Sequence, residues 1–319
     1  KDKEQVISIT TNGKLESLQN CNRRSILEIE EEKTPTYESI TIGTNVTIDN
    51  LYIQASGIKR MTFENDKGCE KANILLNSSD WDISMVKTPV LHLYLTQKNN
   101  LEIKELNASN LEIIAKHKMN NLHISSCSQL QSLTISALIQ KEVEIDQIKI
   151  DNMPQLAYLK LYATIGTIAT AEKLPSLKQL SLNNFHYKTL TMDSEVGSSS
   201  GLTFKAVEFN VSKPIKFSNQ LAEVEINNTS STYSSEVETL DFSNCQQLRT
   251  LRVSGLNKLE SINLGDDNKT LDEVNLKELP KLIALDLSRC KNLKNIEVSY
   301  ASSLRSTKFS ADNETIEKH

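Results

Sequence analysis

Aliphatic residues recur at a nearly constant interval in the last third of the chain. Between residues 237 and 309 an apolar residue, one residue of any kind and a second apolar residue return every 11 or 12 positions. The first member of each pair is Leu240, Leu251, Ile262, Val274, Leu285 or Ile296, and the second is Phe242, Val253, Leu264, Leu276, Leu287 or Val298. Such alternation predicts short strands with both apolar side chains on one face. Its regular return predicts repeats that stack on a shared core.

Alternate pieces of this pattern differ, so one full turn is expected to contain two of them, or about 22 residues. Cys245 and Cys290 each close a Ser-x-Cys triplet, whereas the intervening pieces carry Ser-Gly-Leu or Lys-Glu-Leu-Pro. Each turn would then hold two short strands, one on each flank. Only eight residues separate Phe242 from Leu251, which leaves no room for a long helix.

The outward charges decide between two registers. A turn of about 22 residues would build two outward stacks, Arg249 on Asp272 on Lys294 and Arg252 on Asn275 on Glu297. Neighbouring strands lie about 4.8 Å apart, and opposite or neutral neighbours suit that spacing. A turn of 11 residues would instead place Glu260 beside Asp272, and the two acids would repel each other. The longer turn is therefore preferred.

The L-x-x-L-x-L-S-x-C-x-x-L units resemble the short leucine-rich repeats of Bacteroides-type bacterial cell-surface proteins. They are also similar to the cysteine-bearing repeats of some internalin-like adhesins. Cysteine occupies the turn only at Cys127, Cys245 and Cys290, and Asn184 and Asn268 stand in equivalent places. The resemblance implies a mostly β, right-handed leucine-rich repeat solenoid with parallel short strands and little helix, and a role in recognition at a cell surface.

The whole chain, residues 1–319, is interpreted as one such solenoid. An atypical first unit is needed to cover the open end of a repeat array. The expected parts are an N-terminal cap (1–35), degenerate repeats (36–100), clearer repeats (101–309) and a polar C-terminal tail (310–319).

Two stretches of small polar residues, 193–201 and 227–236, interrupt the pattern. Insertions between repeats emerge as rim loops, often on the binding side, although a surface loop without any role is the alternative. Tyr233 is the aromatic residue of the second stretch and the candidate for a ligand contact. Trp81, the single tryptophan, is expected to pack under a loop, with an exposed stacking platform as the alternative.

Composition restricts the partners. The net charge is -5 with both signs interspersed, so the chain lacks the basic footprint of a nucleic-acid binder. No apolar run approaches the roughly 18 residues of a membrane helix. The start Lys1-Asp2-Lys3-Glu4 resembles the tether that follows a lipid-bearing cysteine in surface lipoproteins, and an arbitrary charged start is the alternative. The membrane is therefore expected as a partner only through an N-terminal lipid anchor, on the extracellular side of the outer membrane.

The five cysteines are scattered singly. Two turns would separate Cys245 from Cys290 by roughly 9–10 Å, beyond the roughly 7 Å that a disulfide tolerates. Both are expected to be free and buried, and Cys127 lies in the same spacing. Cys21 and Cys69 do not fit this register, so a bridge between them stays open.

No catalytic residue, metal site or cofactor is predicted. His92, His117, His123 and His186 fall in different turns, and the chain lacks the G-x-S-x-G, H-E-x-x-H and phosphate-loop motifs. His123 alternates with two apolar neighbours, so it should point out of a strand.

The outward strand positions are the candidate binding site. One flank would present Asp241, Asn263 and Asp286 with Lys308, and the other Arg252, Asn275 and Glu297. This mixture of charges and amides suits a protein or a polar polymer. The first hypothesis is a non-catalytic surface protein that recognises a host or microbial macromolecule. Alternatives are a glycan-capture component of a nutrient-uptake system, an enzyme, or a spacer that holds another domain off the membrane.

Overall fold

A computed structural model of the chain describes most residues after Asn100 and shorter segments before it. The described residues are 5–10, 25–30, 39–42, 48–54, 60–64, 68–76, 83, 86–96, 100–137, 143–228, 235–266 and 268–310. Within them the structure contains strands and turns and no helix. The chain divides into two compact units, residues 1–146 with 150–156 and residues 147–149 with 157–319, and each is described by itself.

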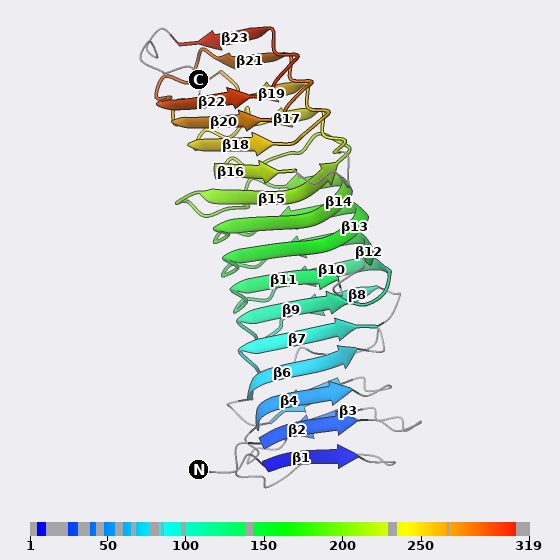
Figure 1. Cartoon of the computed structure of the whole chain (residues 1–319). Coiled ribbons are helices and arrows are strands. Elements are labelled where there is room, and N and C mark those ends of the chain that lie inside the picture. Colours follow the sequence, from blue (N-terminus) through cyan, green and yellow to red (C-terminus); the bar gives the residue numbers. More distant parts are fainter. Residues whose placement is uncertain are drawn as a thin grey trace. The chain divides into compact units, whose positions relative to one another are not determined.

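The first unit consists of parallel strands stacked as rungs (Figure 1). One sheet pairs β1, β2, β4, β6, β7, β9 and β11 in that order. Shorter parallel pairs join β3 to β5 and β8 to β10. The strands are β1 (Gln5–Thr10), β2 (Ser25–Glu30), β3 (Ser39–Ile42), β4 (Ile48–Gln54), β5 (Arg60–Phe63), β6 (Cys69–Leu76), β7 (Val90–Leu95), β8 (Leu101–Lys104), β9 (Asn110–Ala115), β10 (Met119–Ser125), β11 (Ser132–Ala137) and β12 (Val143–Asp151).

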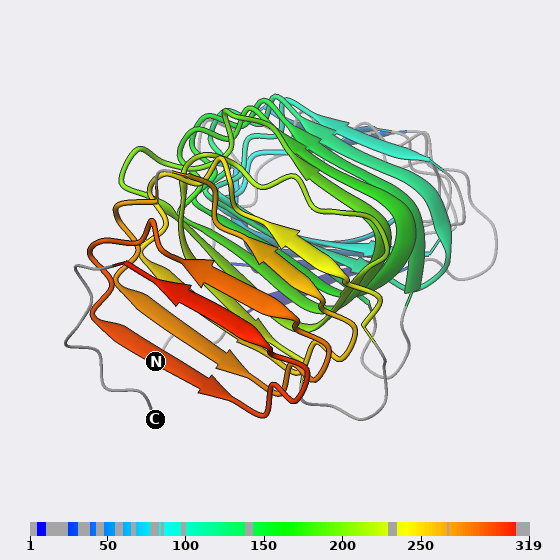
Figure 2. The same ribbon diagram turned by 90° about the horizontal axis from the view of Figure 1, so that it is seen from above.

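The second unit has parallel strands on two flanks of a coil, and Figure 2 shows its yellow-to-red turns as two layers. One sheet pairs β13, β14, β15, β16, β18, β20 and β22, and the other pairs β17, β19, β21 and β23. The strands are β13 (Tyr158–Glu172), β14 (Gln179–Met192), β15 (Leu202–Val211), β16 (Leu221–Asn227), β17 (Thr239–Asp241), β18 (Thr250–Ser254), β19 (Ser261–Asn263), β20 (Glu273–Lys277), β21 (Ala284–Leu287), β22 (Asn295–Ser299) and β23 (Ser306–Phe309).

The register agrees with a turn of about 22 residues and excludes the shorter one. Arg252 pairs with Asn275, and Asn275 pairs with Glu297. The Asp272 N–H donates to Arg249 O at 2.9 Å, and the Lys294 N–H donates to Asp272 O at 2.8 Å. Both outward stacks predicted from charge are therefore present, and the fold is a β-solenoid with two short strands per turn in this region.

The repeated Leu closes a tight turn before strands of both sheets, ahead of β18 and β22 in the long sheet and ahead of β19 and β21 in the short one. The N–H of Leu248, Leu259, Leu282 and Leu293 donates to the carbonyl three residues earlier, at 3.1, 3.1, 3.2 and 3.3 Å. Leu248, Leu259 and Leu282 are fully buried under these turns. The spacing L-x-x-L-x-L thus places its first leucine at the turn and the next two on the inward face of the strand.

A column of left-handed residues bends the long strands of the second unit. Ala163, Asn184 and Glu208 lie at equivalent positions of β13, β14 and β15, with φ of 52, 47 and 51°. At this corner the strand continues instead of ending, which explains why β13 and β14 reach 15 and 14 residues although short strands were predicted. Asn184 is therefore a bend within a strand and not the turn residue that the sequence suggested. Farther along the same column stands Gly255, with φ of 74°.

The cores are apolar and include the cysteines. Cys127, Cys245 and Cys290 are free and buried, as predicted. Cys69 is also free and buried, so it forms no bridge in this structure, and Cys21 lies outside the described residues. In the second unit, phenylalanine rings pack against one another inside the coil, with Phe217 stacked on Phe242 at 4.8 Å. Burial raises the pKa of the Cys245 thiol to about 12, so this thiol is a small hydrophobe.

Residues 193–201 are packed against the preceding turn for part of their length. Val196 is fully buried and forms a bridge with Leu174, and the Gly197 N–H donates to Leu174 O at 3.1 Å. This stretch was expected as a rim loop, and the structure instead places Val196 in the wall of the coil. Of the second expected loop, residues 229–234 lie outside the described residues, as do Trp81 and residues 311–319 of the expected tail.

Candidate functional site

The first candidate column runs along the short sheet of the second unit. Asp241 pairs with Asn263 between β17 and β19, and Asp286 pairs with Lys308 between β21 and β23. All four side chains are exposed, and those of Asp241, Asn263 and Asp286 alternate with buried residues of their strands. Lys308 Nζ lies 3.1 Å from Asp286 Oδ2. The structure thus brings the predicted residues into one outward column.

Three members of this column also hold the turns that follow their strands. Oδ1 of Asp241, Asn263 and Asp286 each accepts the backbone N–H two residues later at 3.0 Å. Such Asx turns use a short side chain to replace a backbone partner. In Asp286, hydrogen bonds from Ser288 and then one from Lys308 lower the pKa to about 2. Each of these side chains therefore uses its Oδ1 to hold the following turn and presents its second polar group outward in a fixed orientation.

The second candidate column lies on the long sheet, where two contacts run diagonally and one joins directly paired residues. Arg252 does not bond its direct neighbour Asn275 but forms a two-pronged pair with Glu273, at 2.9 and 2.8 Å. Glu297 accepts from Asn275 Nδ2 at 2.7 Å and lies 2.8 Å from Lys277 Nζ. A guanidinium reaches two carboxylate oxygens at once, which fixes its orientation. The charges of this face are therefore held in a defined pattern.

Tyr233, the remaining candidate, lies outside the described residues. The residues that flank it are firmly held. The Asn228 amide bonds both backbone groups of Phe209, at 2.7 and 2.6 Å, and Glu236 forms an ion pair with Lys258 at 2.6 Å. Asn228 and Glu236, on either side of the segment that carries Tyr233, are therefore held in place.

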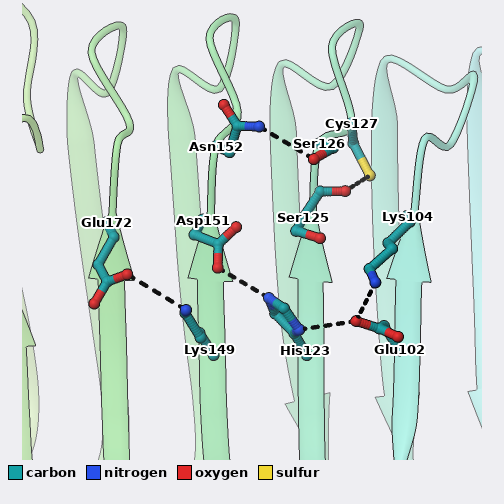
Figure 3. A network of polar contacts seen from close by, with 10 residues as sticks. All are labelled: Glu102, Lys104, His123, Ser125, Ser126, Cys127, Lys149, Asp151, Asn152 and Glu172. Carbon is teal, nitrogen blue, oxygen red and sulfur yellow. Dashed lines mark hydrogen bonds and ion pairs between the residues drawn. The ribbon is translucent and has the colours of Figure 1, made fainter.

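In the first unit, a polar ladder crosses the sheet that holds β8, β10 and β12 (Figure 3). His123 Nε2 lies 2.9 Å from Asp151 Oδ2, and His123 Nδ1 lies 3.2 Å from Glu102 Oε1. Lys104 Nζ lies 2.7 Å from the same Glu102 oxygen, and this hydrogen bond is the main cause of the lowered pKa of Glu102. His123 points outward as predicted. Because carboxylates flank both of its ring nitrogens, it serves as a cross-strand link.

An aromatic group that sequence reasoning missed lies on the outward face of the first unit. Tyr52 and His92 both pair with Asn73 of β6, and Tyr94 pairs with Leu75 of the same strand. Tyr52, His92 and Tyr94 are half-buried, and Lys116 Nζ lies 5.5 Å from the centre of the Tyr94 ring. Burial, more than the nearby Lys71, lowers the pKa of His92. The alternation LHLYL was the signal that could have identified this face.

A hollow of about 510 Å³ opens at the corner of three successive turns of the second unit. Its size falls within the range of small-ligand sites, about 300–1,000 Å³. The lining is rich in side-chain amides, and it comprises Met192, Asp193, Ser194, Lys216, Phe217, Asn219, Gln220, Asn244, Gln246 and Gln247. Sequence reasoning did not anticipate it, because the residues come from segments that are more than twenty positions apart.

Among the residues that the structure describes, none form a group of three or more metal-binding side chains. In the same residues no helix is long and apolar enough to cross a membrane.

Comparison with known proteins gives little support for a relationship. No protein-family model and no curated protein matches the chain. Among solved structures, it is similar to a leucine-rich repeat protein from Eubacterium ventriosum ATCC 27560, at 12% identity and a TM-score of 0.23, over 87% of this chain and 82% of that chain. A likeness at this level carries no argument about function. The description of the fold as a β-solenoid rests on the strand pairing itself.

Proposed function

We propose that this protein is a non-catalytic recognition protein that binds a host or microbial macromolecule at a cell surface. The proposed surface is the pair of outward columns on the second unit, with Asp241, Asn263 and Asp286 on one sheet and Arg252, Asn275 and Glu297 on the other. A solenoid spends its inward residues on the core and leaves its outward residues free to vary. The observation that supports the proposal best is this regular stacking of exposed polar side chains.

The chemistry of the columns favours a polar partner. Arg252 is locked by Glu273, and Asn275 is locked by Glu297, so a partner meets groups whose orientation is already fixed. Pre-organised groups lose less freedom on binding than mobile ones. We therefore place a protein or a polysaccharide in the role of ligand, and not a nucleic acid. We also propose the extracellular side of an outer membrane as the location, with a lipid anchor as the attachment.

The test is a screen of the purified protein on arrays of host proteins and glycans, followed by column variants. Asp241→Asn with Asp286→Asn removes two charges and keeps the Oδ1 that accepts the turn N–H. Arg252→Gln with Glu297→Gln removes one positive and one negative charge from the column of the long sheet. We expect one of these pairs to weaken the strongest array signal by about tenfold or more, with melting temperature unchanged.

The matched control is an ion pair of the first unit, Lys118 with Glu144 at 2.7 Å. Its double glutamine variant should bind as the original chain does. Tyr233→Ala tests the loop, and it is preferable to deletion of residues 227–236 because Asn228 is a buried structural residue. If both column variants and Tyr233→Ala bind the ligand as tightly as the original chain does, the proposed surface is contradicted.

The second candidate function is glycan capture for nutrient uptake. The observation in its favour is the aromatic group on the first unit, where Tyr52 and Tyr94 share one outward face. Flat rings on a sheet are stacking platforms for polar polymers. Under this alternative, Tyr52→Ala with Tyr94→Ala would abolish a glycan signal while the column variants leave it unchanged.

A further inference from the structure

The amide-lined hollow of the second unit is a binding site candidate independent of the two columns. Three consecutive turns build it, with residues 192–194 at the end of β14, residues 216–220 preceding β16 and residues 244–247 preceding β18. The turns are fixed to one another by backbone bonds, such as Met192 N–H to Lys216 O at 3.3 Å. Cys245 Sγ also lies 3.5 Å from Ser218 O. The walls of the hollow are therefore held in place by the same contacts between turns that hold the solenoid together.

A relay of side-chain amides lines this hollow. Gln247 Nε2 donates to Gln220 Oε1 at 2.9 Å, and Gln220 Nε2 donates to Asn219 Oδ1 at 3.4 Å. The first bond uses one of the two Nε2 hydrogens of Gln247, and the carbonyl oxygen of that amide takes no part in it. Asn244 and Gln246 add two exposed amides at the rim. The hollow thus offers donors and acceptors side by side.

The charges of the lining nearly balance. Asp193 Oδ1 and Oδ2 accept the Lys173 N–H at 3.3 and 3.2 Å, and Oδ1 also accepts the Glu195 N–H at 3.0 Å. These bonds commit the carboxylate to the backbone. Lys216 contributes one positive charge at the exposed edge. The hollow is therefore polar without a strong preference for an anion or a cation.

The two apolar residues of the lining expose almost none of their side chains. Met192 is fully buried, and Phe217 is only 5% exposed because its ring stacks on Phe242. Tight protein contacts depend on aromatic or aliphatic anchors in apolar pockets, and this lining has none to spare. Hydroxyl groups, in contrast, both donate and accept, as amides do.

We propose that this hollow binds a neutral saccharide, whose hydroxyl groups exchange hydrogen bonds with the amides of Gln247, Gln246 and Asn244. The inference goes beyond the proposed function, since it involves neither outward column and none of the residues substituted there. A chain can carry this pocket whether its main partner is a protein or a glycan.

The experiment is calorimetric titration of the full chain with maltotriose, cellotriose, mannotriose and triacetylchitotriose, and with trigalacturonic acid as the acidic comparison. We expect at least one neutral trisaccharide to bind. The double variant Asn244→Ala with Gln246→Ala, and the single variant Gln247→Ala, should each raise the Kd of that trisaccharide by about tenfold, since each variant removes hydrogen bonds to its hydroxyl groups.

The control is Gln129→Ala in the first unit. Gln129 occupies the same place in the turn closed by Leu130 N–H to Cys127 O that Gln247 occupies in the turn closed by Leu248 N–H to Cys245 O. The Kd of the trisaccharide for Gln129→Ala should equal that for the original chain, and all variants should melt at the same temperature. The inference is overturned if no neutral trisaccharide binds at millimolar concentration, or if the hollow variants bind as the control does. Binding of trigalacturonic acid alone, abolished by Lys216→Ala, would also overturn it.

Discussion

The buried amide of Asn228 gives the sharpest stability prediction. Strand β16 pairs with β15 as far as Asn227, which lies opposite Val207. Beyond that point, the Phe209 N–H donates to Asn228 Oδ1 at 2.7 Å, and Asn228 Nδ2 donates to Phe209 O at 2.6 Å. An asparagine amide carries one acceptor and one donor group in the arrangement of a peptide. It therefore extends the ladder by one residue after the backbone has turned away.

Replacing Asn228 with Ala leaves both backbone groups of Phe209 without these partners. Phe209 is fully buried and Asn228 is 6% exposed, so solvent has little access to either. Each buried group left unsatisfied costs about 1–3 kcal/mol, and partial entry of water reduces the sum. We expect Asn228→Ala to lower the free energy of unfolding by about 3 kcal/mol, at the high end for a single substitution.

Urea unfolding followed by circular dichroism measures this loss. With a slope of about 2 kcal/mol per M, the midpoint should fall by about 1.5 M. Asn227→Ala is the control, because the side chain of Asn227 lies next in sequence to Asn228 but is exposed. The urea midpoint of this variant should change little. Asn228→Asp keeps the acceptor and loses the donor, so it should also destabilise the chain. An Asn228→Ala midpoint equal to that of the control would refute the reasoning.

Three other predictions follow from single residues of the second unit. Gly255→Ala should destabilise the chain by at least about 2 kcal/mol in the same urea assay, because φ is 74° and the new Cβ would meet Asn228 O at 2.0 Å; an unchanged midpoint would count against it. The Cys245 thiol, with a pKa of about 12, should not react with Ellman's reagent at pH 8 until urea unfolds the chain, and fast labelling of the folded form would contradict its burial. The Asp286 carboxyl should titrate near pH 2 by NMR, and Ser288→Ala should raise that pKa toward the ordinary value because Ser288 provides the largest stabilisation of the carboxylate. Since the folded pKa is depressed, the stability that Asp286 contributes is complete above its ordinary pKa and is lost as the pH falls through about 2; no change in Ser288→Ala would refute the assignment.

Neighbouring residues of one column can differ in what the sequence reveals about them. Arg252 was predicted to stack beside Asn275, and the pairing confirms that register. Its ion pair with Glu273 was not predicted, because a long side chain on a twisted sheet reaches diagonal neighbours as easily as direct ones. In the same way, Asp241 was identified as outward, but its bond to the Ser243 N–H appears only when the turn is seen.

The sequence by itself determined the period, the register, the inward faces and the burial of Cys127, Cys245 and Cys290, because each depends on alternation that is local and repeats. The tertiary structure alone decided three other features. They are the bend at Asn184, the ladder extension by Asn228, and the hollow lined by amides of three turns. The physical reason is that these depend on where side chains from different turns meet. Which side chains meet is set by the backbone dihedrals and by how successive turns stack. Neither can be read from the spacing of residues in the sequence.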